Sequence, residues 1–423
     1  MHIQTDRAFV PGGAPAVRYL HVVISAPSRR AEDDAARTPA SVAMVLDRSG
    51  SMSGAKLQMA REAVVHAIRL LSARDHFAVV CYDQEVTVVM DRSQATNEAK
   101  QLALERLNAI DARGSADLHA GWQQGAALAK GNESEEAALS KVLLLTDGLA
   151  NQGVIDRDAL IATARRLRAG GVMTSTFGVG ADFDEDLLSR LAIEGGGHFY
   201  FIERPQQIPD YFAGELGETL DVVARDVLFE IAFDPGVDAM VLNDLPAERQ
   251  DDRLRVKLGD LVAEQEVSLI TAALFKGAQG AGASLGVTCR VIDRDGALPP
   301  LPMTVRWQAV DRVKDQNQRI DRDVRFAVAS LLADRARRAA LAANASGDYA
   351  EATRLLRGAV DDLRALAPGD PQVLGIIDKL HHDELELSGA LPPTIRKAKH
   401  FAAYQAIYSR EAEGTAKRPK RPR

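Results

Sequence analysis

Cysteine is almost absent from this sequence, and long hydrophobic runs are missing altogether. Only Cys81 and Cys289 occur in 423 residues, each inside a short apolar run, so we expect two small buried side chains and no disulfide. No uncharged apolar stretch is long enough to span a bilayer. Residues 1–7 lack the charged segment and apolar core of a signal peptide. We therefore expect a cytoplasmic protein without a membrane span.

An excess of positive charge is also missing. The chain has 52 Lys and Arg against 59 Asp and Glu, a formal net charge of -7. Such a balance repels nucleic acid and anionic membrane surfaces, so we expect no nucleic acid partner. The 46% of hydrophobic and 26% of charged residues are typical of folded domains. A chain of this length has room for roughly two or three of them.

Short apolar runs alternate with amphipathic helical patterns between about residues 40 and 213. This order is typical of an α/β domain, in which a doubly wound, mostly parallel, Rossmann-like sheet has helices on both faces. One run, Val86–Met90, follows its predecessor after a turn too short for a parallel crossover, so we expect an antiparallel edge strand. The parallel strands are expected at Val42–Leu46, Phe77–Tyr82, Val142–Thr146, Thr174–Gly178 and His198–Ile202.

The hydrophobic period changes twice after this region. From about residue 222 to 310 apolar residues alternate, which predicts a β-sandwich, and from 311 to 412 the pattern is helical. An earlier alternating run, Val17–Ser25, precedes a polar linker, and we expect that strand to join the β-sandwich. The predicted division is 1–38 for the N-terminal strand and linker, 39–221 for the α/β domain, 222–310 for the β-sandwich, 311–412 for the helical region and 413–423 for a disordered basic tail.

Oxygen-bearing side chains follow two of the expected strands. Asp47, Ser49 and Ser51 come directly after Val42–Leu46, and Asp147 comes directly after the strand that ends at Thr146. Ligands bind at the carboxyl ends of the strands in an open parallel sheet, so both loops are expected to face one point. Carboxylate and hydroxyl oxygens suit Mg²⁺ or Mn²⁺ better than zinc.

The charge of this set predicts a binding role. Two carboxylates and two hydroxyls balance a divalent ion without saturating it, and Mg²⁺ keeps water on its remaining positions. An open position on such an ion attracts a carboxylate from another molecule. We therefore expect a binding module or assembly scaffold whose partner protein presents an acidic residue.

The same residues resemble a known family. Asp47-x-Ser49-x-Ser51 with Thr146-Asp147-Gly148 is similar to the metal-ion-dependent adhesion site of von Willebrand factor A (VWA) and integrin I domains, and the likeness covers about residues 40 to 213. The segment from Leu258 to Phe275 is similar to the β-domain that follows the A domain in bacterial and plant proteins of this type. The resemblance implies a protein-binding metal site. On its rim we expect Arg48, Met52, Asp117 and Gly148 to contact the partner.

One position departs from the family pattern. The family places a metal-ligating Thr in a Gly-rich loop, and here that loop is Arg113-Gly114-Ser115-Ala116-Asp117, with Ala116 at the Thr position. We predict that Ser115 supplies the missing oxygen, and Asp117 is the other candidate. If neither reaches the metal, the coordination lacks that oxygen.

Three other interpretations remain open. Ser and Asp also occur at ordinary strand-end turns and helix caps, which would make the protein a structural scaffold with a vestigial metal site. A Mg²⁺-dependent hydrolase or phosphotransferase is a further alternative, but Ser49 stands where such an enzyme needs a second carboxylate, so we predict a protein that is not an enzyme. The run His381–Glu384 could ligate a metal, although adjacent residues point to different sides of a helix.

Overall fold

The computed structural model describes residues 1–29, 37–131, 139–277 and 280–419. By its contacts the chain divides into two compact units. The first contains Arg29–Val222 and Pro392–Phe401, and the second contains Met1–Ser28, Val223–Leu391 and Ala402–Arg423.

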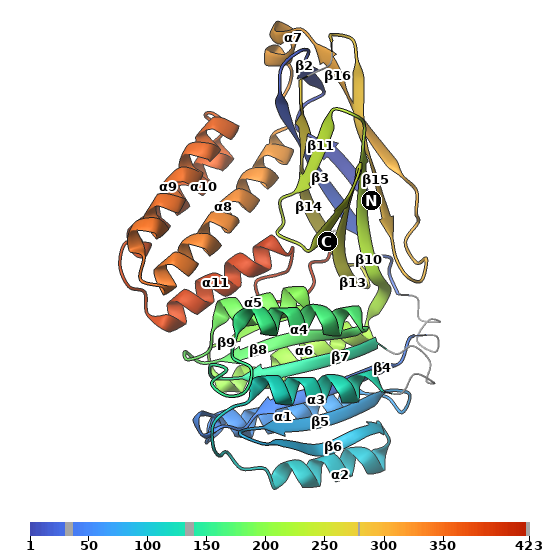
Figure 1. Ribbon diagram of the computed structural model, residues 1–423, viewed down its shortest axis with the longest axis vertical. Coiled ribbons are helices and arrows are strands. Elements are labelled where there is room, and N and C mark those ends of the chain that lie inside the picture. The colour runs from blue at the N-terminus through green and yellow to red at the C-terminus, as the bar shows by residue number, and fades with distance from the viewer. Residues whose placement is uncertain (30–36, 132–138, 278–279, 420–423) are drawn as a thin grey trace. The chain divides into compact units, whose positions relative to one another are not determined.

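The first unit is built on a six-stranded sheet (Figure 1). Its order is β6-β5-β4-β7-β8-β9, and the strands are β4 (Ala40–Asp47), β5 (His76–Tyr82), β6 (Val86–Gln94), β7 (Leu139–Thr146), β8 (Val172–Val179) and β9 (Gly196–Ile202). Neighbouring strands are parallel except for β6, which pairs antiparallel with β5. This confirms the predicted doubly wound sheet and its antiparallel edge.

Helices cover this sheet and hold its central strands in place. They are α1 (Ala55–Leu70), α2 (Asn97–Asn108), α3 (Leu118–Lys130), α4 (Arg157–Ala169), α5 (Glu185–Glu194) and α6 (Ile208–Leu220). Every residue of β4 and β7 is buried, as the continuous apolar runs of a covered parallel strand require. Helix α3 lies so close to the sheet that a Cβ atom added at Gly121 would stand 2.6 Å from the Tyr82 ring. The start of α3 is thereby placed beside the carboxyl end of β5.

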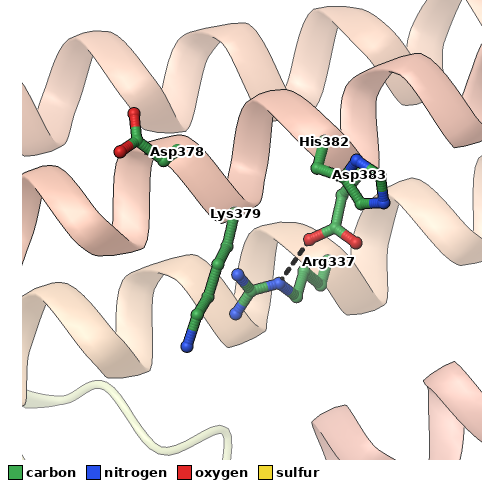
Figure 2. A pocket seen from close by; sticks show the side chains of 5 residues that line it. All are labelled: Arg337, Asp378, Lys379, His382 and Asp383. Atoms are coloured by element: carbon green, nitrogen blue, oxygen red, sulfur yellow. Dashed lines mark hydrogen bonds and ion pairs between the residues drawn. The ribbon is translucent and has the colours of Figure 1, made fainter.

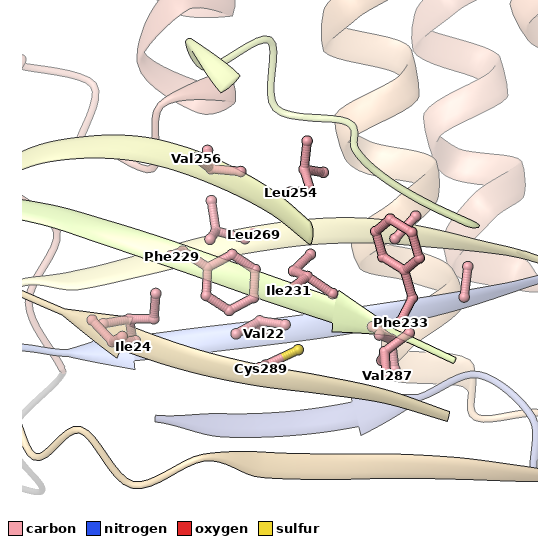
Figure 3. Packing of buried hydrophobic residues seen from close by; sticks show 14 of the residues in the cluster. Val22, Ile24, Phe229, Ile231, Phe233, Leu254, Val256, Leu269, Val287 and Cys289 are labelled. Atoms are coloured by element: carbon pink, nitrogen blue, oxygen red, sulfur yellow. The ribbon is translucent and has the colours of Figure 1, made fainter. Parts of the chain in front are cut away.

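The second unit contains a sandwich of two sheets. One has the order β1-β3-β14-β11, with β1 (His2–Thr5), β3 (Ala16–Ser25), β14 (Glu266–Phe275) and β11 (Val237–Val241). The other has the order β12-β13-β10-β15-β16-β2, with β12 (Ala247–Gln250), β13 (Arg253–Val262), β10 (Val222–Phe233), β15 (Ser284–Ile292), β16 (Met303–Val310) and β2 (Phe9–Pro11). Side chains of both sheets share one core, in which Val22 and Leu269 meet Phe229 and Cys289 (Figure 3). Strand β3 pairs along its whole length with β14.

The helical region follows the sandwich in the chain. It consists of α7 (Arg312–Asn317), α8 (Arg322–Ala345), α9 (Tyr349–Leu366), α10 (Pro371–Leu387) and α11 (Pro393–Ile407). Apolar side chains of α8, α9 and α10 form a second core with Ile270 and Ala272 of β14. The outer face of the four-stranded sheet is therefore covered by helices. In the part of the chain described here, no helix is both long and apolar enough to cross a membrane.

The C-terminal segment differs in part from the prediction of a disordered tail. Arg410 forms an isolated β-bridge with Ala416, Arg410 Nε donates to the Gly414 carbonyl at 2.7 Å, and the Glu266 N–H donates to the Lys417 carbonyl at 2.8 Å. The carbonyl groups of Gly414 and Lys417 are therefore paired, which the basic, Pro-containing composition does not reveal. Residues 420–423 of the predicted tail and 30–36 of the predicted linker lie outside the described residues.

Candidate metal centre

Asp47 ends the central strand β4 and is fully buried. The Ser49 N–H donates to Asp47 Oδ1 at 2.8 Å, and Thr146 Oγ1 donates to Asp47 Oδ2 at 2.8 Å. Burial raises the pKa of the Asp47 carboxyl above its ordinary value, and the bonds from Ser49 and Thr146 act in the opposite direction. The carboxylate is thus held by neutral donors at the edge of the sheet.

Asp147 lies on the neighbouring strand end and joins the same cluster. It is fully buried, and Ser51 Oγ donates to Asp147 Oδ1 at 2.7 Å. Ser49 Oγ and Ser51 Oγ are 3.1 Å apart. Ser51 is exposed, whereas Ser49 is buried. The four residues that the sequence predicts as metal ligands therefore form one connected set of oxygens, open to solvent on the side of Ser51.

A cation that is not among the predicted ligands, Lys56, lies at this cluster. Lys56 Nζ donates to Asp147 Oδ2 at 2.5 Å, and the Lys56 side chain is 26% exposed. Lys56 belongs to the first turn of α1, five residues after Ser51. That spacing is visible in the sequence, but it does not reveal on which side of the turn the ammonium lies. Thr146 belongs to the predicted motif Thr146-Asp147-Gly148, but its place at the end of a continuous apolar strand does not reveal that its hydroxyl donates to Asp47.

The Gly-rich loop 113–117 is fastened to the metal motif by its backbone. The Gly50 N–H donates to the Gly114 carbonyl at 3.0 Å, and the Arg113 N–H donates to the Arg48 carbonyl at 2.8 Å. Within the part of the chain that the structure describes, Ser115 Oγ is buried and has no hydrogen-bond partner. Burying a hydroxyl without a hydrogen-bond partner costs free energy, so the unpartnered Ser115 Oγ in the loop bonded to the metal motif is consistent with a role as a metal ligand.

The next two loop residues, Ala116 and Asp117, form hydrogen bonds to other parts of the domain. Ala116 is 4% exposed, and its N–H donates to Asn151 Oδ1 at 3.2 Å in the loop after β7. Asp117 is the N-cap of α3, where its carboxylate accepts the Ala120 N–H at 2.9 Å. Because capping already occupies one oxygen of Asp117, Ser115 is the better candidate for the oxygen that Ala116 lacks.

Two of the predicted rim residues are misplaced. Arg48 is 6% exposed, and its guanidinium turns toward β5 and β6, where Nε lies 2.8 Å from Asp83 and Nη2 donates to Thr87 at 2.8 Å. Met52 is fully buried in a short 3₁₀ turn. Neither side chain is available to a partner, so the prediction of a rim contact is wrong for both. Gly148 and Asp117 are partly exposed and remain predictions.

These residues fit a hard divalent cation. Asp47 and Asp147 supply two carboxylates, and Ser49, Ser51 and Ser115 supply neutral hydroxyls, which is the oxygen-rich set that Mg²⁺ and Mn²⁺ prefer. The unpartnered Ser115 Oγ supports the same assignment.

Comparison with known families agrees with this geometry. The model of the von Willebrand factor type A domain matches residues 41–214. This segment is a VWA domain. Among solved structures, a von Willebrand factor type A protein from Catenulispora acidiphila is similar with a TM-score of 0.70 at 16% identity, covering 99% of this chain and 97% of its own. The ArnB paralog VWA2 from Sulfolobus acidocaldarius is similar with a TM-score of 0.60 at 15% identity, covering 97% and 98%. At these identities the two structures show the fold alone.

Sequence relatives cover less of the chain. An uncharacterised protein of Synechocystis sp. is 26% identical over 63% of this chain and 64% of its own length. The protein YfbK of Escherichia coli strain K12 is 28% identical over 54% and 42%. The human inter-alpha-trypsin inhibitor heavy chain H4 is 29% identical over 38% and 18%. The matched region is less than two thirds of each relative's length.

A second titratable cluster lies within the VWA unit. His198, Glu215 and Glu218 bring ligand atoms within 4.8 Å of one another. However, Glu215 is fully buried and already forms an ion pair with Lys141 and accepts hydrogen bonds from Ser175 and Tyr200. Its charge is neutralised inside the protein, so we assign the cluster to the packing of α6 on the sheet.

A pocket in the second unit also carries charged groups (Figure 2). It is lined by Arg337, Asp378, Lys379, His382 and Asp383. Arg337 Nε donates to Asp383 at 2.7 Å, while His382 lies 3.2 Å from Glu386 one turn along α10. His381 Nδ1 lies 3.6 Å from Glu384, but His382 and Asp383 are paired with other residues, so the run His381–Glu384 does not converge on one point.

Proposed function

We propose that the protein is a metal-dependent protein-binding module or assembly scaffold, which holds Mg²⁺ or Mn²⁺ at Asp47, Ser49, Ser51, Asp147 and Ser115. The observation that carries the proposal is the connected set of oxygens at the ends of β4 and β7, buried at Asp47 and Asp147 and open at Ser51. A bound metal would supply an electrophilic position that accepts a carboxylate of the partner. Asp117 and Gly148 would contribute to the rim.

The chain's own residues would prepare the site. Thr146 and the Ser49 N–H fix the orientation of the Asp47 carboxylate, and Ser51 holds Asp147. The Lys56 ammonium forms an ion pair with the Asp147 carboxylate, which lowers the cost of burying a second carboxylate beside Asp47. The Lys56 side chain reaches solvent, so it is free to leave Asp147 when a metal competes for that oxygen.

The experiment is a binding measurement with and without chelator. Tagged protein in Mg²⁺ should retain a partner that carries an acidic segment, and EDTA should release it. An Asp147→Ala variant should behave like the chelated protein. Partner binding that is equal in Mg²⁺ and EDTA would contradict a metal-dependent role.

The alternative of a hydrolase is supported less well. Ser51, Lys56 and Thr146 donate to Asp47 and Asp147. None of them is a general base, and Ser49 stands where an enzyme of this type needs a further carboxylate two residues after Asp47. We expect no turnover of phosphate or carboxylate esters in the presence of Mg²⁺. Turnover that is abolished by Asp47→Ala would overturn this expectation.

A further inference from the structure

A cluster of arginines surrounds one buried carboxylate on the outer face of the six-stranded sheet of the sandwich. Glu230 lies on β10 and is 2% exposed. Arg290 stands directly opposite it on β15, and Arg253 and Arg255 come from β13 on the other side of β10. The distances to the Glu230 oxygens are 2.7 Å from Arg290 Nε, 3.1 Å from Arg253 Nη1 and 2.8 Å from Arg255 Nε. One carboxylate therefore orients three guanidinium groups.

The cluster carries more positive charge than the fold needs. Three guanidinium groups against one carboxylate leave a surplus of two positive charges. The exposed Asp252, 3.8 Å from Arg253 Nε, offsets this surplus only in part. Glu248, opposite Arg255 on β12, is itself ion-paired with Lys257. If the arginines served only to neutralise the buried Glu230 carboxylate, one or two of them would be enough.

The guanidinium groups are accessible and keep donors to spare. The side chains of Arg253, Arg255 and Arg290 are 45%, 44% and 40% exposed. Each guanidinium has five N–H donors in a fixed fork, and Arg255 uses Nε to hold Glu230. The outer face of the other sheet is covered by α8–α10. Among the described residues, the arginine face stays accessible, as the exposure of its three side chains shows.

We propose that this arginine face, defined by Arg253, Arg255 and Arg290 around Glu230, binds a phosphorylated segment of a partner protein. A phosphate monoester carries about −1.5 to −2 charges and three acceptor oxygens at pH 7, which is enough to neutralise the positive charge that remains after the contribution of Asp252. Guanidinium groups bind phosphate oxygens in pairs, and Glu230 holds them in place before the ligand arrives. This binding is separate from the metal centre.

Nucleic acid fits this face less well. On β10, β13 and β15 the residues that alternate with Glu230, Arg255 and Arg290 on the same face contain no aromatic ring, so bases would lack a stacking platform. The formal net charge of -7 also works against a long polyanion. A single side-chain carboxylate has only two acceptor oxygens for the three guanidinium groups, whereas a phosphate monoester offers three.

The test uses the full chain and a fluorescent Gly-Ser peptide with one phosphoserine, measured by anisotropy in low salt with EDTA. The phosphopeptide should bind about tenfold or more tightly than its unphosphorylated form. Arg255→Gln and Arg290→Gln should each lower its affinity by about tenfold. Arg364→Gln, which removes the same charge from an arginine 56% exposed on α9, should leave it unchanged. Circular dichroism melting verifies that each variant is folded.

Several results would overturn the proposal. The first is equal binding of the two peptides. The second is phosphopeptide binding that survives both Arg255→Gln and Arg290→Gln, or that is weakened as much by Arg364→Gln. Absence of binding in EDTA, together with binding when Mg²⁺ replaces EDTA, would place the phosphate on the metal centre instead. A single-stranded oligonucleotide that binds better than the phosphopeptide, with the same dependence on Arg255 and Arg290, would assign the face to nucleic acid.

Discussion

Asp47 in the VWA domain and Glu230 in the β-sandwich are both buried carboxylates, yet their surroundings are opposite. Asp47 accepts hydrogen bonds from the neutral groups of Ser49 and Thr146, and burial raises its pKa. Burial acts on Glu230 in the same direction, but hydrogen bonds from Arg255 and Arg290 bring its pKa below the ordinary value. Asp47 has no basic side chain among these partners, whereas Glu230 has three guanidinium groups around one carboxylate.

This contrast indicates the ligand of each region. A buried carboxylate that lacks a basic partner is stabilised by an added cation, and the hydroxyls around Asp47 are ligands for one. A carboxylate surrounded by three guanidinium groups already has its partners, so the remaining charge is available to an anion. We therefore expect changes at the first region to alter cation binding and changes at the second to alter stability and anion binding.

Removing a carboxylate from the metal centre should have the largest effect. In Asp147→Ala the affinity for Mg²⁺ or Mn²⁺ should fall by more than about 100-fold, because changes at residues that only hold the ligands in place already cost about 10–100-fold. Isothermal titration calorimetry provides the measurement. Asp91→Ala, an exposed carboxylate on β6, is the matched control and should bind metal normally. An unchanged isotherm in Asp147→Ala would remove the metal centre from the comparison.

The second effect concerns the arginine face. Glu230→Gln should lower the free energy of unfolding by about 1–3 kcal/mol, because three guanidinium groups lose the carboxylate that holds them together. Urea denaturation measures the change. Arg255→Gln should cost less, since Arg253 and Arg290 still pair with Glu230. A larger loss in Arg255→Gln than in Glu230→Gln would mean that the carboxylate is not the centre of the cluster.

Acid gives an independent reading of the same carboxylate. The pKa of Glu230 in the folded protein lies below its ordinary value of 4.5. The ionised carboxylate therefore stabilises the fold fully above about pH 4.5, and this stabilisation is lost as the pH falls through the lowered pKa. Below about pH 4.5 the wild-type protein should therefore lose stability more steeply than Glu230→Gln. Parallel stability curves for the two proteins would contradict this account.

A smaller effect is expected from the cation inside the metal centre. Lys56 neutralises part of the charge on Asp147 and competes with the metal, so Lys56→Met should raise metal affinity by about tenfold at low ionic strength. Arg69→Met removes a charge from an exposed position in the last turn of α1 and serves as the control. Weaker metal binding in Lys56→Met would mean that Lys56 positions Asp147 instead of competing for it.

The backbone frame of the VWA domain is predictable from the sequence. Buried parallel strands are continuous apolar runs, and Val42–Leu46 and Val142–Thr146 fall inside β4 and β7. Parallel strands present their carboxyl ends at one edge, which is why Asp47 and Asp147 can be placed together without coordinates.

Side-chain direction and long-range pairing are less accessible. Arg48 follows Asp47 by one residue, but its direction depends on the turn between β5 and β6, which places Asp83 within reach. Met52 is buried because a 3₁₀ turn rotates it inward. The partners of Glu230 come from two further strands, whose register the alternating pattern leaves open. These features require the folded chain.

The smallest expected effect tests the loop in which Ala116 replaces the family's Thr. If Ser115 already supplies the oxygen, Ser115→Ala should weaken metal binding by about 1 kcal/mol, the net worth of one polar interaction, and Ala116→Thr should change it little. If Ser115 does not reach the metal, Ala116→Thr should strengthen binding and Ser115→Ala should have no effect. The unpartnered Ser115 Oγ favours the first result, and the bond from the Ala116 N–H to Asn151 means that a threonine introduced at this position would have a backbone already held in place. Calorimetry of both variants distinguishes the two cases. If neither substitution changes metal affinity, this loop is not part of the coordination sphere, and the metal centre consists of Asp47, Ser49, Ser51 and Asp147.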